Sequence, residues 1–297
     1  MDIVYRFDPH APLEFKRPRT NKQALKMLEQ GNMRFCKMVK HIQTIGEGET
    51  NHPPMVIPVN PIQLGIPLVK GLEVMQAPWA LVLGCADARV PIEHVMDCSA
   101  NDLFVVRVAG NVLGLECIGS VDYAATHMRD SLQSVIVLGH TGCGAVTATV
   151  DVYLSPNNFS DIAFSHPVRT LIDRLMLSVR GAAKALEQEC GSNVHKDSHY
   201  RDWLIATACY VNAAATSFDL QREVNSVTKG LNVSYTVYDT AWSRIEALPI
   251  RPDEEADSPD RVVFGNAPRS AEEFTELSKR IIQRLVENAG GSKKRKS

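Results

Sequence analysis

The sequence predicts an α/β fold in which a mostly parallel central sheet is flanked by helices. Two short runs, 103–108 and 134–139, are apolar and rich in Val, Ile and Leu, which is typical of parallel strands covered on both faces. Helical patterns separate the strand patterns along the chain, as they do in βαβ units. The 297 residues, 44% of them hydrophobic, suffice for one large α/β domain or two small ones.

The N-terminal quarter is predicted to hold one helix followed by a long loop. Residues 21–38 follow a helical pattern that Gly31 interrupts, with apolar positions at Ala24, Leu25, Leu28, Met33 and Phe35. The loop over 44–76 is predicted from its prolines, which stand at positions 53, 54, 58, 61 and 67 and forbid a regular helix. A loop of this length is either functional or mobile.

From residue 80 onward, strands and helices are predicted to alternate. We expect strands over 80–85, 103–108, 134–139 and 231–238. We expect helices over 117–130, 143–152, 167–189 and 200–229. The last strand, 231–238, alternates only weakly between apolar and polar residues, which suits an edge strand. Sites in sheets of this kind form at the carboxyl ends of the strands.

The chain is divided at residue 250 in this interpretation. Residues 1–250 form the α/β domain, including the N-terminal helical arm. Residues 251–297 hold a polar linker at 251–260, an amphipathic helix at 270–288 and a basic tail. The apolar face of that helix carries Phe274, Leu277, Ile281, Ile282 and Leu285. We expect the tail, GGSKKRKS, to be solvated.

Composition excludes several classes of protein. A net charge of −2 gives no basis for binding nucleic acid or acidic lipid. The sequence holds no run of apolar residues long enough to span a membrane, and its start lacks the apolar stretch of a signal peptide. Seven widely spaced cysteines, an odd number, indicate free thiols in a reducing compartment. We therefore expect a cytoplasmic protein.

The stretch LVLGCADARVP, residues 81–91, closes an apolar strand with three reactive side chains. Cys85, Asp87 and Arg89 occupy every second position. In an extended chain such positions point the same way. This strand end is therefore predicted to aim a thiol, a carboxylate and a guanidinium at one place.

A second reactive group follows the strand over 134–139. The sequence GHTGCGAV, residues 139–146, places His140 and Cys143 on the turn before the next helix. Thiolate sulfur and imidazole nitrogen are ligands that zinc favours. Three protein ligands, Cys85, His140 and Cys143, would leave the fourth coordination position open, as in catalytic zinc sites.

Two other interpretations of these residues are weighed against metal binding. Each cysteine could simply pack in the core, because free cysteine behaves as a small hydrophobe. A cysteine hydrolase could use Cys143 as nucleophile and His140 as base. The hydrolase leaves Cys85, Asp87 and Arg89 without a role, so metal binding is favoured.

The combined pattern C-x-D-x-R and H-x-x-C resembles that of the β-class carbonic anhydrases. The resemblance covers about residues 21–245 and is carried further by the segments LKMLEQGNMRF, QAPWALVLGCADARVP, LFVVRVAGN, GSVDYA, SVIVLGHTGCGAV and, more weakly, GLNVSYTVYD. It implies a lyase, carbonic anhydrase, in which a zinc-bound hydroxide hydrates CO2 reversibly to bicarbonate and a proton. It also implies one zinc ion per subunit and a homodimer or higher homo-oligomer.

The resemblance further implies roles for single residues. Asp87, paired with Arg89, would orient the zinc-bound water. When the pair breaks, Asp87 would take the fourth position and close the site, and opening at higher pH is the hypothesis that follows. Gln76, Phe104 and Tyr123 match positions of the family's substrate pocket.

Two alternatives to CO2 hydration are retained. The same fold and metal could serve a hydrolase of CS2 or COS, because this too adds water to a linear heteroallene. The other alternative is a zinc-binding protein without turnover. The Asp87–Arg89 pair argues against it, since a structural zinc site needs a fourth protein ligand.

Overall fold

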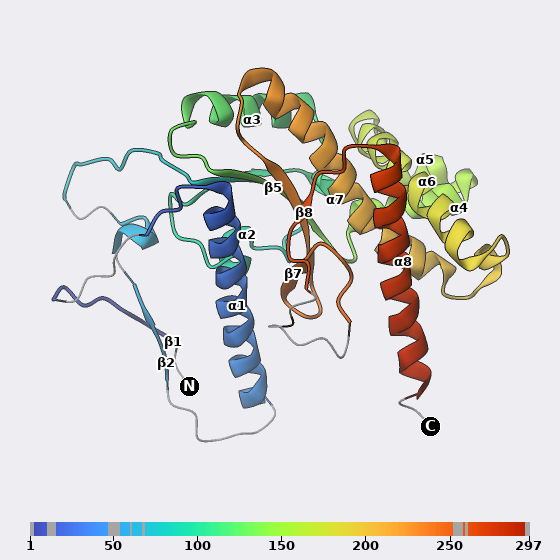
Figure 1. Cartoon of the computed structure of the whole chain (residues 1–297), viewed down its shortest axis with the longest axis horizontal. Helices are drawn as coiled ribbons and strands as arrows, with labels where there is room; N and C mark the ends of the chain where they lie inside the picture. Colours follow the sequence, from blue (N-terminus) through green and yellow to red (C-terminus); the bar gives the residue numbers. More distant parts are fainter. Residues whose placement is uncertain are drawn as a thin grey trace.

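The centre of the computed structural model is a six-stranded sheet (Figure 1), and the structure describes residues 3–10, 16–46, 54–59, 61–66, 69–251, 258 and 261–294. The parallel strands are, in spatial order, β4 (Leu103–Arg107), β3 (Ala80–Gly84), β5 (Ser134–His140) and β6 (Val233–Asp239). Two short strands pair antiparallel with β6, namely β7 (Arg244–Glu246) and β8 (Gly265–Asn266). The predicted α/β fold with a mostly parallel sheet is confirmed.

Helices cover both faces of this sheet. One face packs on α1 (Asn21–Gly46) and α2 (Ile92–Val95). The other face packs on α3 (Leu115–His127), α4 (Gly144–Leu154), α6 (His166–Cys190), α7 (Tyr200–Val227) and α8 (Ala271–Lys294). Shorter helical turns are η1 (Pro61–Leu64), η2 (Ala109–Asn111), η3 (Pro156–Asn158), α5 (Phe159–Ile162) and η4 (Val194–Lys196). None of the helices in the described ranges combines the length and apolarity needed to cross a bilayer.

The two faces are separated by the alternation of side chains along the strands. In β3 and β5, the even-numbered residues pack toward α1 and α2, and they are Ala80, Val82, Ile136 and Leu138. The odd-numbered residues pack toward the larger helical layer, and they are Leu81, Leu83, Val135 and Val137. Successive strand residues point to opposite faces, so continuous apolar runs are needed to bury both.

The first helix differs from its prediction. α1 runs to Gly46 and passes through Gly31 without interruption. A Cβ at Gly31 would lie 1.8 Å from the carbonyl oxygen of Met96, which follows α2. Glycine here permits α1 to approach the backbone after α2, and the interruption predicted at this position is wrong.

The loop predicted over 44–76 is partly wrong. It contains η1 and the strand β2 (Met55–Pro58), which pairs in parallel with β1 (Ile3–Arg6). These two strands form a ribbon apart from the main sheet, beside α1 (Figure 1). Pro58 is tolerated because it is the last residue of its strand. The remainder of the loop includes 47–53, 60 and 67–68, which are outside the described residues.

β6 was predicted to lie at the sheet edge, and this is wrong. It pairs with β5 on one side and with β7 and β8 on the other, and six of its seven residues are buried. Its polar residues are accommodated inside the sheet: the Thr236 hydroxyl donates to the Val263 carbonyl at 2.7 Å. β5 is buried along its whole length, as predicted. The same burial predicted for residues 103–108 is wrong, because β4 lies at the sheet edge and is only partly buried.

The predicted C-terminal helix is present as α8, which packs on α6 and α7. Ile281 and Ile282 are buried in the same apolar cluster as residues of those helices. Of the predicted linker, 251–260, only Arg251 and Ser258 belong to the described residues. The division of the chain at residue 250 stays a prediction.

Replacing Gly31 with alanine is expected to lower the free energy of unfolding by about 1–3 kcal/mol, the usual cost of overpacking. The methyl group would overlap the Met96 carbonyl, so α1 would have to move away from α2. Urea titration measures the effect. The matched control is Gly119→Ala in α3, where the new Cβ would meet no described atom within 4 Å apart from its chain neighbours and its own helix backbone. That control should stabilise by about 0.5–1 kcal/mol, and equal losses in both variants would contradict the expectation.

Candidate metal centre

β3 and β5 are neighbouring strands. From β3 the chain continues to β4 on one side, and β5 and β6 then lie on the other side, so the strand order reverses between β3 and β5. The helix after β3, α2, packs on one face, and the helix after β5, α4, packs on the other. Ligand sites of open α/β sheets form at the carboxyl ends of two such strands. Cys85 directly follows β3, His140 is the last residue of β5, and Cys143 is the N-cap of α4.

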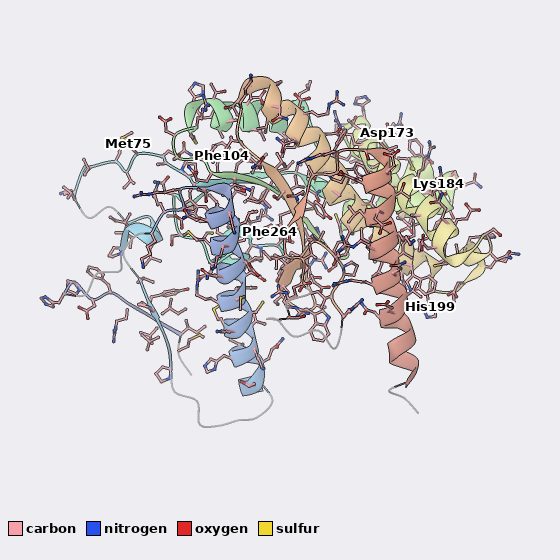
Figure 2. The ribbon with its side chains drawn as sticks, viewed as in Figure 1. Met75, Phe104, Asp173, Lys184, His199 and Phe264 are labelled. Carbon is pink, nitrogen blue, oxygen red and sulfur yellow. The ribbon has the colours of Figure 1, made fainter. Side chains whose placement is uncertain are left out.

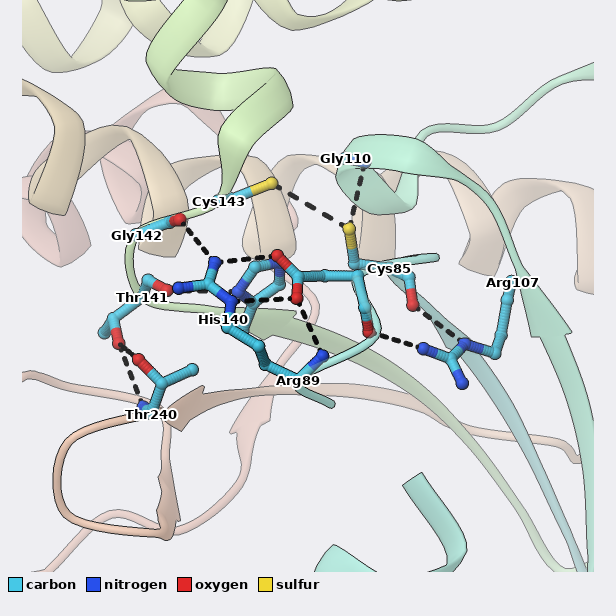
Figure 3. A network of polar contacts seen from close by, with 10 residues as sticks. Cys85, Arg89, Arg107, Gly110, His140, Thr141, Gly142, Cys143 and Thr240 are labelled. Atoms are coloured by element: carbon cyan, nitrogen blue, oxygen red, sulfur yellow. Dashed lines mark hydrogen bonds and ion pairs between the residues drawn. The ribbon is translucent and has the colours of Figure 1, made fainter. Parts of the chain in front are cut away.

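The three predicted metal ligands meet at this point (Figure 3). The candidate ligand atoms of Cys85, His140 and Cys143 all lie within 4.8 Å of one another, and the two Sγ atoms are 3.9 Å apart. All three side chains are buried. Residues from two separate strand ends therefore converge on a space of the size of one metal ion.

The imidazole of His140 is held in an orientation suited to metal binding. Its Nδ1 lies 3.0 Å from the Thr141 carbonyl oxygen, which can only accept, so Nδ1 carries the hydrogen. Nε2 is buried and has no hydrogen-bond partner among the described residues. Asp87 Oδ2 lies 3.8 Å away, too far for a hydrogen bond.

A buried nitrogen lone pair without a donor is costly, and a cation would satisfy it. The pKa shifts of the two thiols also agree with a cation at this position. Contact with the Cys143 thiol lowers the pKa of Cys85, and the same contact, together with burial, raises the pKa of Cys143. One of the two thiols therefore loses its proton more readily than the other, and a divalent cation would displace the protons of both. Two sulfurs and one imidazole nitrogen fit a zinc ion with three protein ligands.

Asp87 and Arg89 form an ion pair beside this centre. The backbone N–H and Nε of Arg89 donate to Asp87 Oδ1 at 2.9 and 3.0 Å, and Nη2 donates to Oδ2 at 2.7 Å. Nη2 also donates to the Gly142 carbonyl at 3.0 Å. This bond connects the ion pair to the turn between His140 and Cys143. The hydrogen bonds from Arg89 hold the pKa of Asp87 well below its usual range, so this carboxylate is charged throughout the neutral range.

Two contacts at the centre were not foreseen from the sequence. Arg107, at the end of β4, donates from Nε to the Cys85 carbonyl at 3.0 Å and from Nη2 to the Asp87 carbonyl at 2.6 Å. The backbone N–H of Gly110 donates to Cys85 Sγ at 3.3 Å. Figure 3 shows both contacts. A charged residue ending an otherwise apolar strand was a signal for Arg107, but a backbone donor leaves no mark in a sequence.

The predicted pocket residues do not join this cluster within the single chain. Phe104 pairs with Leu81, and the strands end three positions later at the pair Gly84–Arg107. Three residues of extended strand place Phe104 about 10 Å from the strand ends. Tyr123 on α3 is 51% exposed and stacks on a histidine ring. Gln76 is exposed on the loop before β3, next to the labelled Met75 of Figure 2. Their assignment to a substrate pocket stays a prediction.

Comparison with known proteins decides the family. A model of the carbonic anhydrase family matches residues 80–241, more than half of the chain. The matched segment contains the three candidate ligands and the ion pair. The chain belongs to the β-class carbonic anhydrase family.

Mycobacterial proteins are among the relatives of this chain. "Carbonic anhydrase 2" of Mycobacterium tuberculosis is 37% identical over 134 residues, 45% of this chain and 55% of the relative. "Carbonic anhydrase" of Mycolicibacterium smegmatis is 34% identical over 172 residues, 57% of this chain and 69% of the relative. In the first match the chain spans about half the length of the relative. A solved structure of Coccomyxa β-carbonic anhydrase in complex with acetazolamide has 23% identity and a TM-score of 0.44, and the match covers 58% of this chain and 72% of that one.

Proposed function

We propose that this chain catalyses the reversible hydration of CO2 to bicarbonate and a proton, with one zinc ion per subunit held by Cys85, His140 and Cys143. One observation carries the proposal. It is the buried triangle of two sulfurs and an imidazole nitrogen without a hydrogen-bond partner among the described residues, in a chain of the carbonic anhydrase family. Three protein ligands leave one coordination position free for the reacting water. When bound, zinc would lower the pKa of water so that a nucleophile exists near neutral pH.

The residues around the centre have proposed roles of their own. Asp87 is ionised and acceptor-only, so it can take a hydrogen bond from the reacting water and orient it. Arg89 holds Asp87 away from the metal position through three hydrogen bonds, and the Gly142 carbonyl steadies Arg89. If this pair opens, Asp87 can turn toward the metal and close the site. Gln76, Phe104 and Tyr123 remain proposed parts of the substrate pocket.

A homodimer or higher homo-oligomer in the cytoplasm is also part of the proposal. Isolated two-stranded ribbons are marginally stable, and the ribbon of β1 and β2 exposes the apolar side chains of Ile3, Val4, Tyr5 and Val56. A second copy covering this ribbon would remove the exposure. The seven unpaired cysteines support a reducing compartment.

The zinc-loaded protein is expected to hydrate CO2 with fast turnover in a stopped-flow assay at pH 8.5. The same protein stripped of metal is the control and should be inactive. No turnover with zinc shown to be bound would contradict the proposal and favour CS2 or COS hydrolysis, or a zinc protein without turnover. Light scattering on the same sample gives the mass of the assembly.

The pH profile of this assay tests the gate. Ionisation of the zinc-bound water alone makes the rate rise with pH, so closure of the site by Asp87 is supported only if the rate between pH 6.5 and 9 rises more steeply in the wild type than in Asp87→Ala. Because the pKa of Asp87 lies far below this window, the rise cannot come from ionisation of that carboxyl group. A flat profile would remove the gate from the proposal and leave the zinc chemistry in place.

A further inference from the structure

The turn between β4 and α3 contacts the metal centre through its backbone. η2 (Ala109–Asn111) brings the N–H of Gly110 within 3.3 Å of Cys85 Sγ. Gly110 has φ 68°, a left-handed conformation that favours glycine, and it is buried. An amide that donates to a thiolate withdraws charge from the sulfur and fixes its orientation, and such hydrogen bonds tune metal centres.

This turn is itself held by a residue from a distant helix. Nδ2 of Asn212, on α7, donates to the Gly110 carbonyl at 2.8 Å. The Ser178 hydroxyl, on α6, lies 3.4 Å from Asn212 Oδ1 and can donate to it. Asn212 is only 3% exposed. A buried amide is tolerated when it is hydrogen-bonded, and this one directs its donor at the turn that contacts Cys85.

We propose that Asn212 is a positioning residue for the metal centre. The side chain of Asn212 holds the carbonyl of Gly110. The N–H of the same Gly110 points at Cys85 Sγ. The side chain of Asn212 bonds to Gly110 and Ser178 and not to a candidate metal ligand, so its effect on the centre passes through Gly110. The inference rests on the proposed function, because it takes Cys85 as a metal ligand.

Other bonds fix the same segment independently of Asn212. The N–H of Val108 donates to the Gly84 carbonyl at 3.1 Å, and the N–H of Ala86 donates to the Val108 carbonyl at 3.2 Å. The N–H of Asn111 donates to the Val108 carbonyl as well, at 2.9 Å. Loss of Asn212 should therefore leave β3 and β4 joined and the protein folded. The peptide between Gly110 and Asn111 would then keep only the bond to Val108, so the direction of the Gly110 N–H becomes less strictly fixed.

The test uses the full-length chain with Asn212→Leu, which has the same number and branching of side-chain heavy atoms but no donor. Zinc affinity is measured by competition with a chelator, and the thiolate-to-metal charge-transfer band is recorded with cobalt(II) in place of zinc. We expect the Kd for zinc to rise about 10- to 100-fold, the range for partners that orient ligands. We also expect the cobalt band to shift.

Thr207→Val is the matched control. Thr207 lies on the same helix, is fully buried, and its hydroxyl has no hydrogen-bond partner among the described residues. It should change neither the Kd nor the cobalt spectrum, even if it lowers Tm as much as Asn212→Leu does. Equal changes in both variants would reduce Asn212 to a packing residue and overturn the inference.

Asn212→Ala is a second variant in case Asn212→Leu does not fold. It removes the donor to Gly110 without adding bulk or charge, so it should repeat the loss of zinc affinity. A wild-type Kd and spectrum in either folded variant would overturn the inference. If neither variant folds, the inference is also overturned, because Asn212 is then required for folding of the protein and not for positioning Cys85. Since none of these readouts uses CO2, an inactive wild-type enzyme would contradict the proposed function while leaving this test valid.

Discussion

Replacing Cys143 with serine is expected to abolish stoichiometric zinc binding and CO2 hydration together. The change removes one of the two sulfurs, which lie 3.9 Å apart, and leaves Cys85 and His140 as the only candidate ligands of the cluster. Loss of a group that merely orients a ligand already costs about 10- to 100-fold in metal affinity or activity. Loss of a ligand should therefore cost more than about 100-fold. Metal content by atomic emission and kcat/KM by stopped flow measure the two effects.

Cys209→Ser is the control for this variant. Cys209 is a buried free cysteine on α7 that lies beside Cys143 but outside the cluster of candidate ligands. Burial raises its pKa to about 11, so it is a neutral thiol in the absence of metal, and its position outside the cluster makes it a control and not a candidate ligand. The control should keep its zinc and its activity, apart from a modest loss of stability. Full zinc occupancy in Cys143→Ser would contradict the assignment of the site.

Replacing Arg89 with alanine is expected to lower kcat/KM on the order of 100-fold while zinc stays bound. The variant loses two of the three hydrogen bonds to Asp87 and the bond to the Gly142 carbonyl. Asp87 remains charged, and its Oδ2 is already 3.8 Å from His140 Nε2, so a small rotation brings it to the metal position. A carboxylate oxygen is an acceptable zinc ligand, and a misplacement of about 1 Å in an active site can cost about 100-fold.

The chain offers a matched ion pair as control. Arg201 donates to both carboxylate oxygens of Asp151 at 2.8 and 3.0 Å, on helices away from the strand ends. Arg201→Ala should leave kcat/KM unchanged. If blockage by Asp87 is the cause of the loss, the double variant Asp87→Ala with Arg89→Ala should be no worse than Asp87→Ala alone. Wild-type kcat/KM in Arg89→Ala would contradict the role given to the pair.

The metal cluster could be predicted from the sequence because its geometry follows from local rules. A thiol at the carboxyl end of one parallel strand lies near an imidazole and a thiol at the end of another when the two strands are neighbours, as β3 and β5 are. Asp87 and Arg89 are two residues apart, so their contact also follows from local backbone geometry. By contrast, the interruption predicted at Gly31 applied an intrinsic penalty of about 1 kcal/mol, and only the structure shows that a side chain at this position would overlap the Met96 carbonyl.

The sequence by itself determined the α/β class, the three candidate ligand residues and the ion pair, because each strand end and each short motif is recognised by periodicity or by a spacing of a few residues. Only the tertiary structure decided that β6 is an inner strand, that β1 pairs with β2, and that Asn212 reaches Gly110 from 102 positions away in the chain. These contacts join segments that are far apart in the chain, and the amino-acid pattern of each segment would be the same with a different partner. Their partners are selected by the packing of the whole chain, so no local stretch of sequence records them.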